Sequence, residues 1–197
     1  MDEKLVKVRR SSKDIGLFGK KGSGKSTLLS ILGFLHYMVG TEVYTNYDVN
    51  FPHIEVHRLI DLMNIPFDQK RKVFLGDDFD FWFQSRSASS SVNRSLNDIL
   101  MFWGKNNLSL IYTAKRPMAI DIGLRESTSE FWDVQLSMND KKDSDLPNKK
   151  EYMNYLMLYI DRFDDQFDYI GNLRIYNLDK IIGLFDTSHK VTDIRKH

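Results

Sequence analysis

The sequence has no cysteine, so the chain can form neither a disulfide bond nor a cysteine-ligated zinc site. It also has no long apolar run: the longest one, residues 28–39, is interrupted by Ser30, Gly33 and His36 and is too short to span a bilayer. The first residues, MDEKLVKVRRSSKD, lack an apolar core, so we expect no signal peptide. These absences argue against a disulfide-stabilised scaffold and against a membrane-spanning helix.

An excess of charge of one sign is absent too, because 28 Lys and Arg residues face 27 Asp and Glu residues, for a formal net charge of +1. Any contact with nucleic acid must therefore come from a local basic patch, or from a ring of patches on several subunits. The length of 197 residues suits one α/β domain, 1–197, and a hydrophobic content of 42% is enough for a sizeable core. The five histidines are scattered without metal-ligand spacing.

The segment GKKGSGKST, residues 19–27, matches the phosphate-binding pattern G-x-x-x-x-G-K-[ST]. We predict a buried strand over 15–18 and a helix over 27–39, which is the setting that this loop needs. Backbone N–H groups of such a loop surround phosphate oxygens, and the helix N-terminus adds its positive dipole. The loop therefore predicts binding of a nucleoside triphosphate. The predicted nucleotide-binding residues are Gly19, Lys20, Lys21, Gly22, Ser23, Gly24, Lys25, Ser26 and Thr27.

The remaining apolar segments predict an α/β fold with a mainly parallel central sheet. Strands are expected over 42–50, 71–76 and 108–113, with helices between them. A short strand and a short helix are expected over 53–66. Residues 130–136, 152–160 and 173–176 also look like strands, and their closeness in sequence predicts an antiparallel C-terminal edge. Residues 96–103 and 178–185 have helical spacing.

Two acids follow the apolar stretch VFLG, at the end of the sheet where ligands bind. The first, Asp77, is placed to hold Mg²⁺ together with the Ser26 hydroxyl. The second, Asp78, is placed to polarise a water molecule for attack on the γ-phosphate. Lys25 is expected to reach the β- and γ-phosphates, so the predicted cofactors are ATP and Mg²⁺. The aromatic cluster FDFWF, 79–83, can pack in the core or stack on bases, and its position favours core packing.

The strand predicted over 108–113 leads into TAKRP, residues 113–117. In motor ATPases such a strand carries a polar sensor at its tip, and Thr113 and Lys115 are placed to face the γ-phosphate. A small-molecule kinase with a similar loop requires a basic lid instead. The charged segment 139–151 mixes Lys with Asp and has no Arg, which favours a motor ATPase over a kinase.

Taken together, GKKGSGKS, VFLGDDFD and LIYTAKRP resemble the FtsK/HerA superfamily of DNA-pumping ATPases. The similarity is strongest to the small genome-packaging ATPases of archaeal and membrane-containing icosahedral viruses. Assembly ATPases of filamentous phages, of the zonula-occludens-toxin-like kind, share much of the pattern. SRSASSSVNRSL, TAKRPMAIDIGLRES and GLFDTSHKV add to the resemblance, which covers about residues 13–192. It implies a RecA-like P-loop NTPase fold.

The resemblance also implies roles for single residues. Lys25 and Ser26 would bind phosphate and Mg²⁺, Asp77 would hold the metal, and Asp78 would take the place of the catalytic acid. The family more often has Glu at the second acid and Gln at the sensor, where this chain has Asp78 and Lys115. A lysine only donates hydrogen bonds, so Lys115 cannot orient a water as an amide does, but it can neutralise charge on the γ-phosphate.

Motors of this family form rings in which an arginine of one subunit completes the site of its neighbour. Such a residue is worth about 10³- to 10⁵-fold in rate. The candidates here are Arg86, Arg94 and Arg125. We therefore expect a homo-oligomeric ring such as a hexamer.

Contact with double-stranded DNA would be non-specific and through the backbone. One candidate contact is the turn that carries Lys141, Lys142, Lys149 and Lys150. The aspartates in the same turn make a plain solvated hairpin the alternative.

The leading hypothesis is a viral ATPase that hydrolyses ATP to move double-stranded DNA into a preformed capsid. The expected partners are DNA and a capsid-vertex or membrane protein, and the expected location is the host cell cytoplasm or a virion vertex. Three alternatives stay open: an ATPase that extrudes a filamentous virion, a small-molecule P-loop kinase, and an interaction module that binds nucleotide without turnover.

Overall fold

The structure, a computed structural model, describes residues 13–66, 68–81, 107–138, 156–176 and 178. The elements in chain order are β1 (Ile15–Phe18), α1 (Lys25–Met38), β2 (Glu42–Thr45), β3 (Ile54–Glu55), the 3₁₀ helix η1 (Leu59–Asn64), β4 (Lys72–Gly76), η2 (Phe79–Phe81), β5 (Leu108–Thr113), η3 (Pro117–Ala119), α3 (Ile122–Ser127), β6 (Glu130–Met138), β7 (Leu156–Asp164) and β8 (Tyr169–Ile175). No helix among these is long and apolar enough to cross a membrane.

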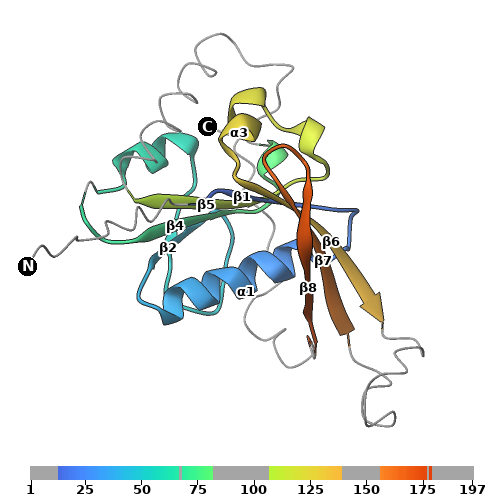
Figure 1. The fold of residues 1–197 in the computed structure, drawn as a ribbon. Coiled ribbons are helices and arrows are strands. Elements are labelled where there is room, and N and C mark those ends of the chain that lie inside the picture. Colours follow the sequence, from blue (N-terminus) through green and yellow to red (C-terminus); the bar gives the residue numbers. More distant parts are fainter. Residues whose placement is uncertain (1–12, 67, 82–106, 139–155, 177, 179–197) are drawn as a thin grey trace, which may run out of the picture.

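The strands form one sheet of eight in the order β3-β2-β4-β5-β1-β6-β7-β8 (Figure 1). All neighbours from β3 to β6 pair in parallel, whereas β6, β7 and β8 pair antiparallel. The predicted parallel sheet with an antiparallel C-terminal edge is therefore confirmed. Strand β5 lies between β1 and β4, so its tip stands between the glycine loop and the two acids.

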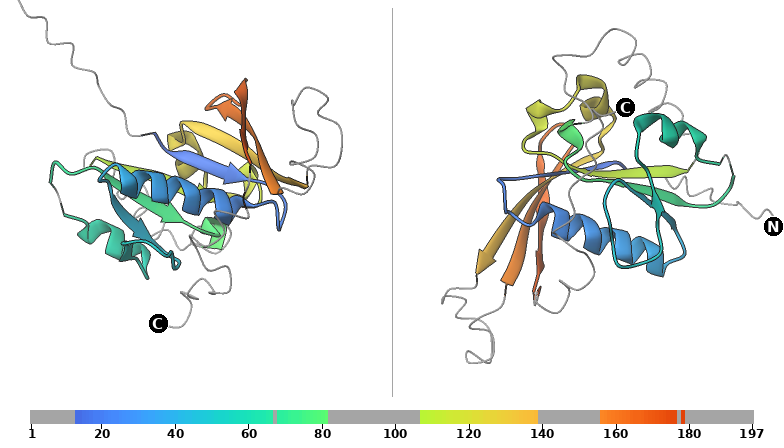
Figure 2. Two further views of the ribbon diagram at one scale, coloured as in Figure 1. Left: turned by 90° about the horizontal axis from the view of Figure 1, so that it is seen from below. Right: turned by 180° about the vertical axis from the view of Figure 1, so that it is seen from behind.

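Alternating side chains of the central strands fill two separate apolar layers. On the face covered by α1, Leu17, Val73 and Ile111 pack with Leu28 and Leu29 of the helix. On the other face the layer is more aromatic, and it includes Phe18, Phe74, Phe79, Tyr112 and Phe131. The α1 helix covers one face of the sheet, while η2 and α3 lie on the other (Figures 1 and 2). The core therefore has three layers, as expected for an α/β domain.

Most of the predicted elements form within a few residues of their expected limits. The helix begins at Lys25 rather than 27, and the helical turn predicted within 53–66 is a 3₁₀ helix. The strand predicted over 152–160 is described from Leu156 to Asp164. Phe79 is 1% exposed and packs against Phe74 and Tyr112, which confirms core packing for this member of the aromatic cluster. The helices predicted over 96–103 and 178–185 lie outside the described residues, apart from Leu178.

An ionic cluster fixes the junction between the parallel sheet and the antiparallel edge. Glu130 begins β6 and is 5% exposed. One of its carboxylate oxygens accepts a hydrogen bond of 2.9 Å from Lys13, and the other accepts bonds of 2.7 Å from Arg162 and 2.9 Å from Trp132. Burial by itself raises the pKa of Glu130, but these hydrogen bonds outweigh it and lower the pKa to about 2.

We expect Glu130→Gln to lower the free energy of unfolding by about 2 kcal/mol at about pH 7, because charged hydrogen bonds are lost. A carboxylate with a lowered pKa stabilises the fold above its unfolded pKa of 4.5, and this contribution is lost as the pH falls toward about 2. The difference between wild type and variant should therefore shrink over that range in urea unfolding measurements. Glu126→Gln, at an exposed position, is the control. A difference that does not depend on pH would contradict the assignment.

Candidate functional site

The glycine loop joins β1 to α1 and wraps around the side chain of Lys25. The Lys25 ammonium donates hydrogen bonds of 3.0 Å to the carbonyl oxygens of Gly19 and Lys20. Gly22 and Gly24 have φ angles of 78° and 90°, in the left-handed region that favours glycine. Gly24 caps the N-terminus of α1, so the first N–H groups of the helix point toward the loop. This is the strand–loop–helix arrangement that the sequence predicted.

Asp77, at the end of β4, is hydrogen-bonded to two hydroxyl groups from distant segments. Ser26 at the start of α1 donates to its two carboxylate oxygens at 2.9 and 3.0 Å, and Thr113 at the end of β5 donates at 2.6 Å. Burial raises the pKa of Asp77, and the hydrogen bonds from Thr113 and Ser26 counteract that rise only in part. The structure thus brings together the two residues that the sequence predicted as metal ligands.

Asn46 holds the backbone of Asp77 and was not predicted as a site residue. Its side-chain amide donates to the Asp77 carbonyl at 2.9 Å, and its carbonyl oxygen accepts from the Asp77 N–H at 2.7 Å. Asn46 directly follows β2, so the second strand of the sheet also positions the acid. Only the pairing of β2 with β4 brings the two residues together, and a single sequence carries no signal for that.

Asp78 and Asp80 add two further carboxyl groups to this end of β4: the Asp78 charge acts on both Asp77 and Asp80. Asp78 has a left-handed backbone, with φ of 44°, and its N–H donates to Thr113 at 2.8 Å. Burial raises the pKa of Asp80 and the Asp78 charge adds to this rise, while the ammonium groups of Lys115 and Lys25 oppose it. Lys115, the predicted sensor residue, therefore lies within electrostatic range of Asp80. Asp80 was missed because the sequence prediction there rested only on the aromatic residues around it, as core or as base-stacking groups.

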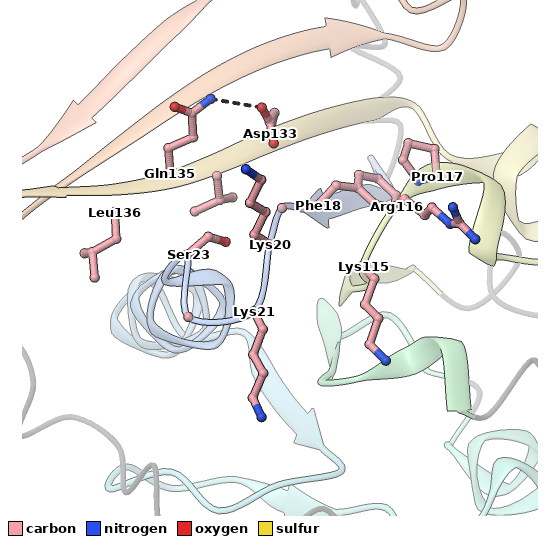
Figure 3. Close-up of a pocket in the computed structure, with 13 residues that line it drawn as sticks. Phe18, Lys20, Lys21, Ser23, Lys115, Arg116, Pro117, Asp133, Gln135 and Leu136 are labelled. Atoms are coloured by element: carbon pink, nitrogen blue, oxygen red, sulfur yellow. Dashed lines mark hydrogen bonds between the residues drawn. The ribbon is translucent and has the colours of Figure 1, made fainter.

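A cavity of about 580 Å³ opens beside the loop. Its walls come from three segments: residues 18–23 at the end of β1 and in the loop, the β5 exit at 115–117, and residues 133–136 of β6 (Figure 3). Asp133 and Gln135 offer polar groups, and the Gln135 amide donates to Asp133 at 3.1 Å. A volume in this range is typical of sites for small organic ligands. The sequence did not predict that β6 borders the site.

Of the three arginines predicted to act in a neighbouring subunit, only Arg125 lies among the residues that the structure describes. Arg125 lies on α3, is partly buried, and donates a hydrogen bond to the sulfur of Met118 at 3.0 Å. Arg116, which was not predicted, lines the cavity next to Lys115. Arg86 and Arg94 fall outside the described residues, as do Lys141, Lys142, Lys149 and Lys150.

Substitution of two loop glycines by alanine separates backbone strain from steric overlap. At Gly22 an added Cβ meets nothing within 4 Å, so Gly22→Ala should cost only the left-handed strain of about 1 to 2 kcal/mol. At Gly24 the same atom would lie 2.4 Å from Leu158 Cδ2, a side chain with no exposed surface. Gly24→Ala should therefore cost about 1 to 3 kcal/mol more than Gly22→Ala in urea unfolding. Equal costs would contradict this packing of the loop against β7.

No family model matches the sequence, and no curated protein matches it. Among solved structures, the N-terminal domain of zonular occludens toxin from Neisseria meningitidis is 14% identical, with a TM-score of 0.56 over 89% of this chain and 100% of that chain. B204, the DNA-packaging ATPase from Sulfolobus Turreted Icosahedral Virus, is 12% identical, with a TM-score of 0.53 over 84% and 97%. The genome packaging NTPase B204 from Sulfolobus turreted icosahedral virus 2, in complex with AMPPCP, is 10% identical, with a TM-score of 0.50 over 81% and 96%.

At these identities the likeness concerns the fold. At that level it confirms the predicted resemblance. The chain therefore has the predicted RecA-like P-loop NTPase fold, and the toxin domain and the viral packaging ATPase are similar to it in fold.

Proposed function

We propose that this protein is a ring-forming ATPase that hydrolyses ATP at the glycine loop to move double-stranded DNA into a viral capsid. The single observation that supports it most is the Ser26–Asp77–Thr113 arrangement at the tip of β5. It joins the phosphate loop, the acid strand and the sensor strand at one point, as a motor ATPase requires. The fold likeness to the viral packaging ATPase B204 supports the same proposal.

The loop fits a nucleoside triphosphate on several counts. Lys25 and the N-terminus of α1 supply positive charge, and α1, with 14 residues, is long enough to carry a helix dipole. The Ser23 hydroxyl oxygen is buried and accepts or donates no hydrogen bond within the described part of the chain. A phosphate oxygen would satisfy that group. The cavity that includes Asp133 and Gln135 would take the nucleoside end.

Ser26 and Asp77 fit a magnesium ion. Mg²⁺ prefers hard oxygen ligands, keeps several waters, and is usually held by one or two protein groups plus the phosphates. A hydroxyl and a carboxylate within 3.0 Å of each other offer this combination. The raised pKa of Asp77 also fits, since a divalent cation favours the ionised carboxylate that burial disfavours. When bound, the ion would neutralise charge on the β- and γ-phosphates.

The chain's own residues would then divide the remaining tasks. Thr113 orients the Asp77 carboxylate and the Asp78 N–H through its hydroxyl group. Asp78 would accept a proton from the attacking water, and Lys115 would neutralise charge on the γ-phosphate. Arg125, or Arg86 or Arg94, would enter the site of the neighbouring subunit. Lysines of the segment 139–151 would contact the DNA backbone.

A filamentous-virion assembly ATPase is the second candidate, and the fold likeness to the zonular occludens toxin domain favours it. Its site chemistry is the same, so its DNA dependence and its partner at the membrane would distinguish it. A small-molecule kinase is less favoured, because β5 stands between the loop strand and the acid strand and carries the sensor position.

We expect the purified protein to hydrolyse ATP faster when double-stranded DNA is added, and Lys25→Ala to abolish turnover both with and without DNA. The reason is that Lys25 supplies the main side-chain charge on the transferred phosphoryl group. Lys70→Ala, at an exposed lysine outside the loop, should keep most of the turnover. Phosphate release is the measurement. Tight ATP binding without turnover under either condition would contradict a stand-alone motor and favour a nucleotide-gated interaction module.

Asp78→Asn and Asp80→Asn test which carboxylate accepts the proton. We expect Asp78→Asn to lower kcat by about 10²- to 10⁴-fold, the usual value of general base catalysis, with ATP affinity little changed. Asp80→Asn should lower kcat by less than about tenfold, because Asp80 follows the acid pair on η2 and acts on it through charge alone. The reverse order of the two effects would assign the proton acceptor to Asp80.

A further inference from the structure

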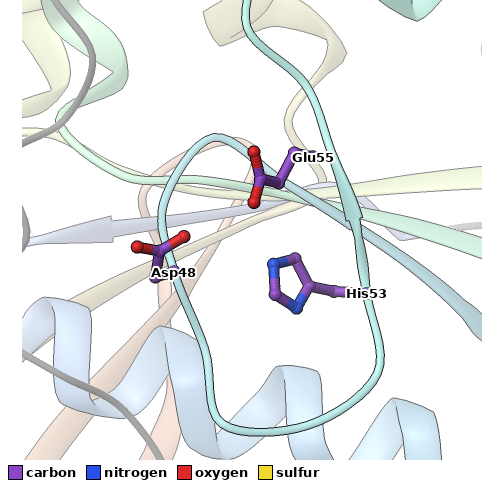
Figure 4. A group of neighbouring side chains, drawn as sticks. All are labelled: Asp48, His53 and Glu55. Carbon is purple, nitrogen blue, oxygen red and sulfur yellow. The ribbon is translucent and has the colours of Figure 1, made fainter.

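A further cluster of polar side chains lies at the outer edge of the sheet, in the loop between β2 and β3 and on β3 itself. Ligand atoms of Asp48, His53 and Glu55 all lie within 4.8 Å of one another. Figure 4 shows the three side chains turned toward the same space, with Asp48 on one side of the loop and His53 and Glu55 on the other. From this juxtaposition we propose that Asp48, His53 and Glu55 bind one divalent transition-metal ion of the Zn²⁺ class.

The hydrogen bonding of His53 prepares it for this role. Its Nδ1 lies 2.9 Å from the carbonyl oxygen of Phe51, and a carbonyl can only accept, so Nδ1 carries the proton. The other ring nitrogen, Nε2, faces Asp48 and Glu55 (Figure 4). A backbone carbonyl on the far nitrogen of an imidazole is the usual support of a metal-binding histidine, because it fixes both the tautomer and the ring orientation.

An imidazole nitrogen and two carboxylates are ligand types that a divalent cation of this class accepts, and a cation between the two carboxylates would reduce the repulsion of their charges. Bonds of about 2.0 to 2.1 Å in a tetrahedral site place ligand atoms about 3.3 to 3.4 Å apart. Small rotations of three side chains would close the observed separations to that range. Zinc accepts both imidazole and carboxylate ligands, and solvent at exposed Glu55 would complete the coordination.

The loop is held firmly enough to present these ligands. Asn46 is bonded to the Asp77 backbone at one end, and Val56 N donates to the Thr45 carbonyl at 2.7 Å at the other. Between them Val49 and Phe51 are buried in the layer under α1. Asp48 and His53 therefore sit next to anchored residues, which lowers the conformational cost of binding.

His57 lies beside the proposed site but is not one of its ligands, so its substitution is a control for the loss of His53. Its Nε2 lies 3.2 Å from Oε2 of Glu55, and its side chain is 60% exposed. Glu55 has a second oxygen, so the His57 contact and a bond to a metal are compatible. Spacing of histidines along the sequence gave no sign of the site, because it uses one histidine and two acids.

The test is titration of the tag-free, nucleotide-free full chain with Zn²⁺ by calorimetry, in excess Mg²⁺. We expect one Zn²⁺ per chain and a higher melting temperature. Because they remove a ligand, His53→Gln and Asp48→Asn should weaken binding by at least about 100-fold and remove the thermal shift. His57→Gln and Asp77→Asn should keep both, which separates this site from His57 and from the acid at the nucleotide site.

Circular dichroism would establish that each variant is folded. Absence of stoichiometric Zn²⁺ binding in the wild type would overturn the proposal. Undiminished binding by His53→Gln would overturn it as well. The proposal does not depend on ATP hydrolysis, so neither result bears on the proposed function.

Discussion

The Asp77 carboxylate is the point on which the geometry of the site depends. It accepts hydrogen bonds from Ser26 of α1 and Thr113 of β5, while Asn46 after β2 holds its backbone. Four segments that are distant in sequence therefore meet at one acid. The meeting requires β5 to lie between β1 and β4, because only then does its tip stand beside both the loop and the acids. The order of the strands in the sheet therefore determines the geometry of the site.

At the site, burial disfavours the charged form of the carboxyl groups, and neighbouring hydroxyl and ammonium groups favour it. Burial raises the pKa of Asp77 and of Asp80, and Phe79 of the aromatic layer stands between Asp78 and Asp80 in the sequence. The hydroxyl groups on Asp77 and the lysines near Asp80 counteract that rise, but they do not remove it. Such a site favours an additional cation or an additional proton. The proposed magnesium–nucleotide complex would supply the cation, which gives a physical link between the packing of this layer and the proposed chemistry.

The loop after β2 connects the polar cluster around Asp77 with the cluster of Asp48, His53 and Glu55. Asn46 at its beginning supports Asp77, and two residues later Asp48 faces His53 and Glu55. Buried Val49 and Phe51 hold the loop against α1, the helix that begins at the glycine loop. A cation bound in the outer cluster would therefore stabilise a segment in direct contact with the nucleotide site. One loop therefore joins the outer edge of the sheet to the proposed active site.

The sequence alone determined the glycine loop, its strand and helix, the acids after β4 and the extent of β5, since each is a local pattern of residue types. Tertiary structure decided the rest. The support of Asp77 by Asn46 and the cavity wall of Asp133 and Gln135 depend on pairings between strands far apart in the chain. The cluster of Asp48, His53 and Glu55 depends on how one loop folds back. A single sequence records which residues are apolar or charged, but not which strands become neighbours, because strand pairing is a property of the whole sheet.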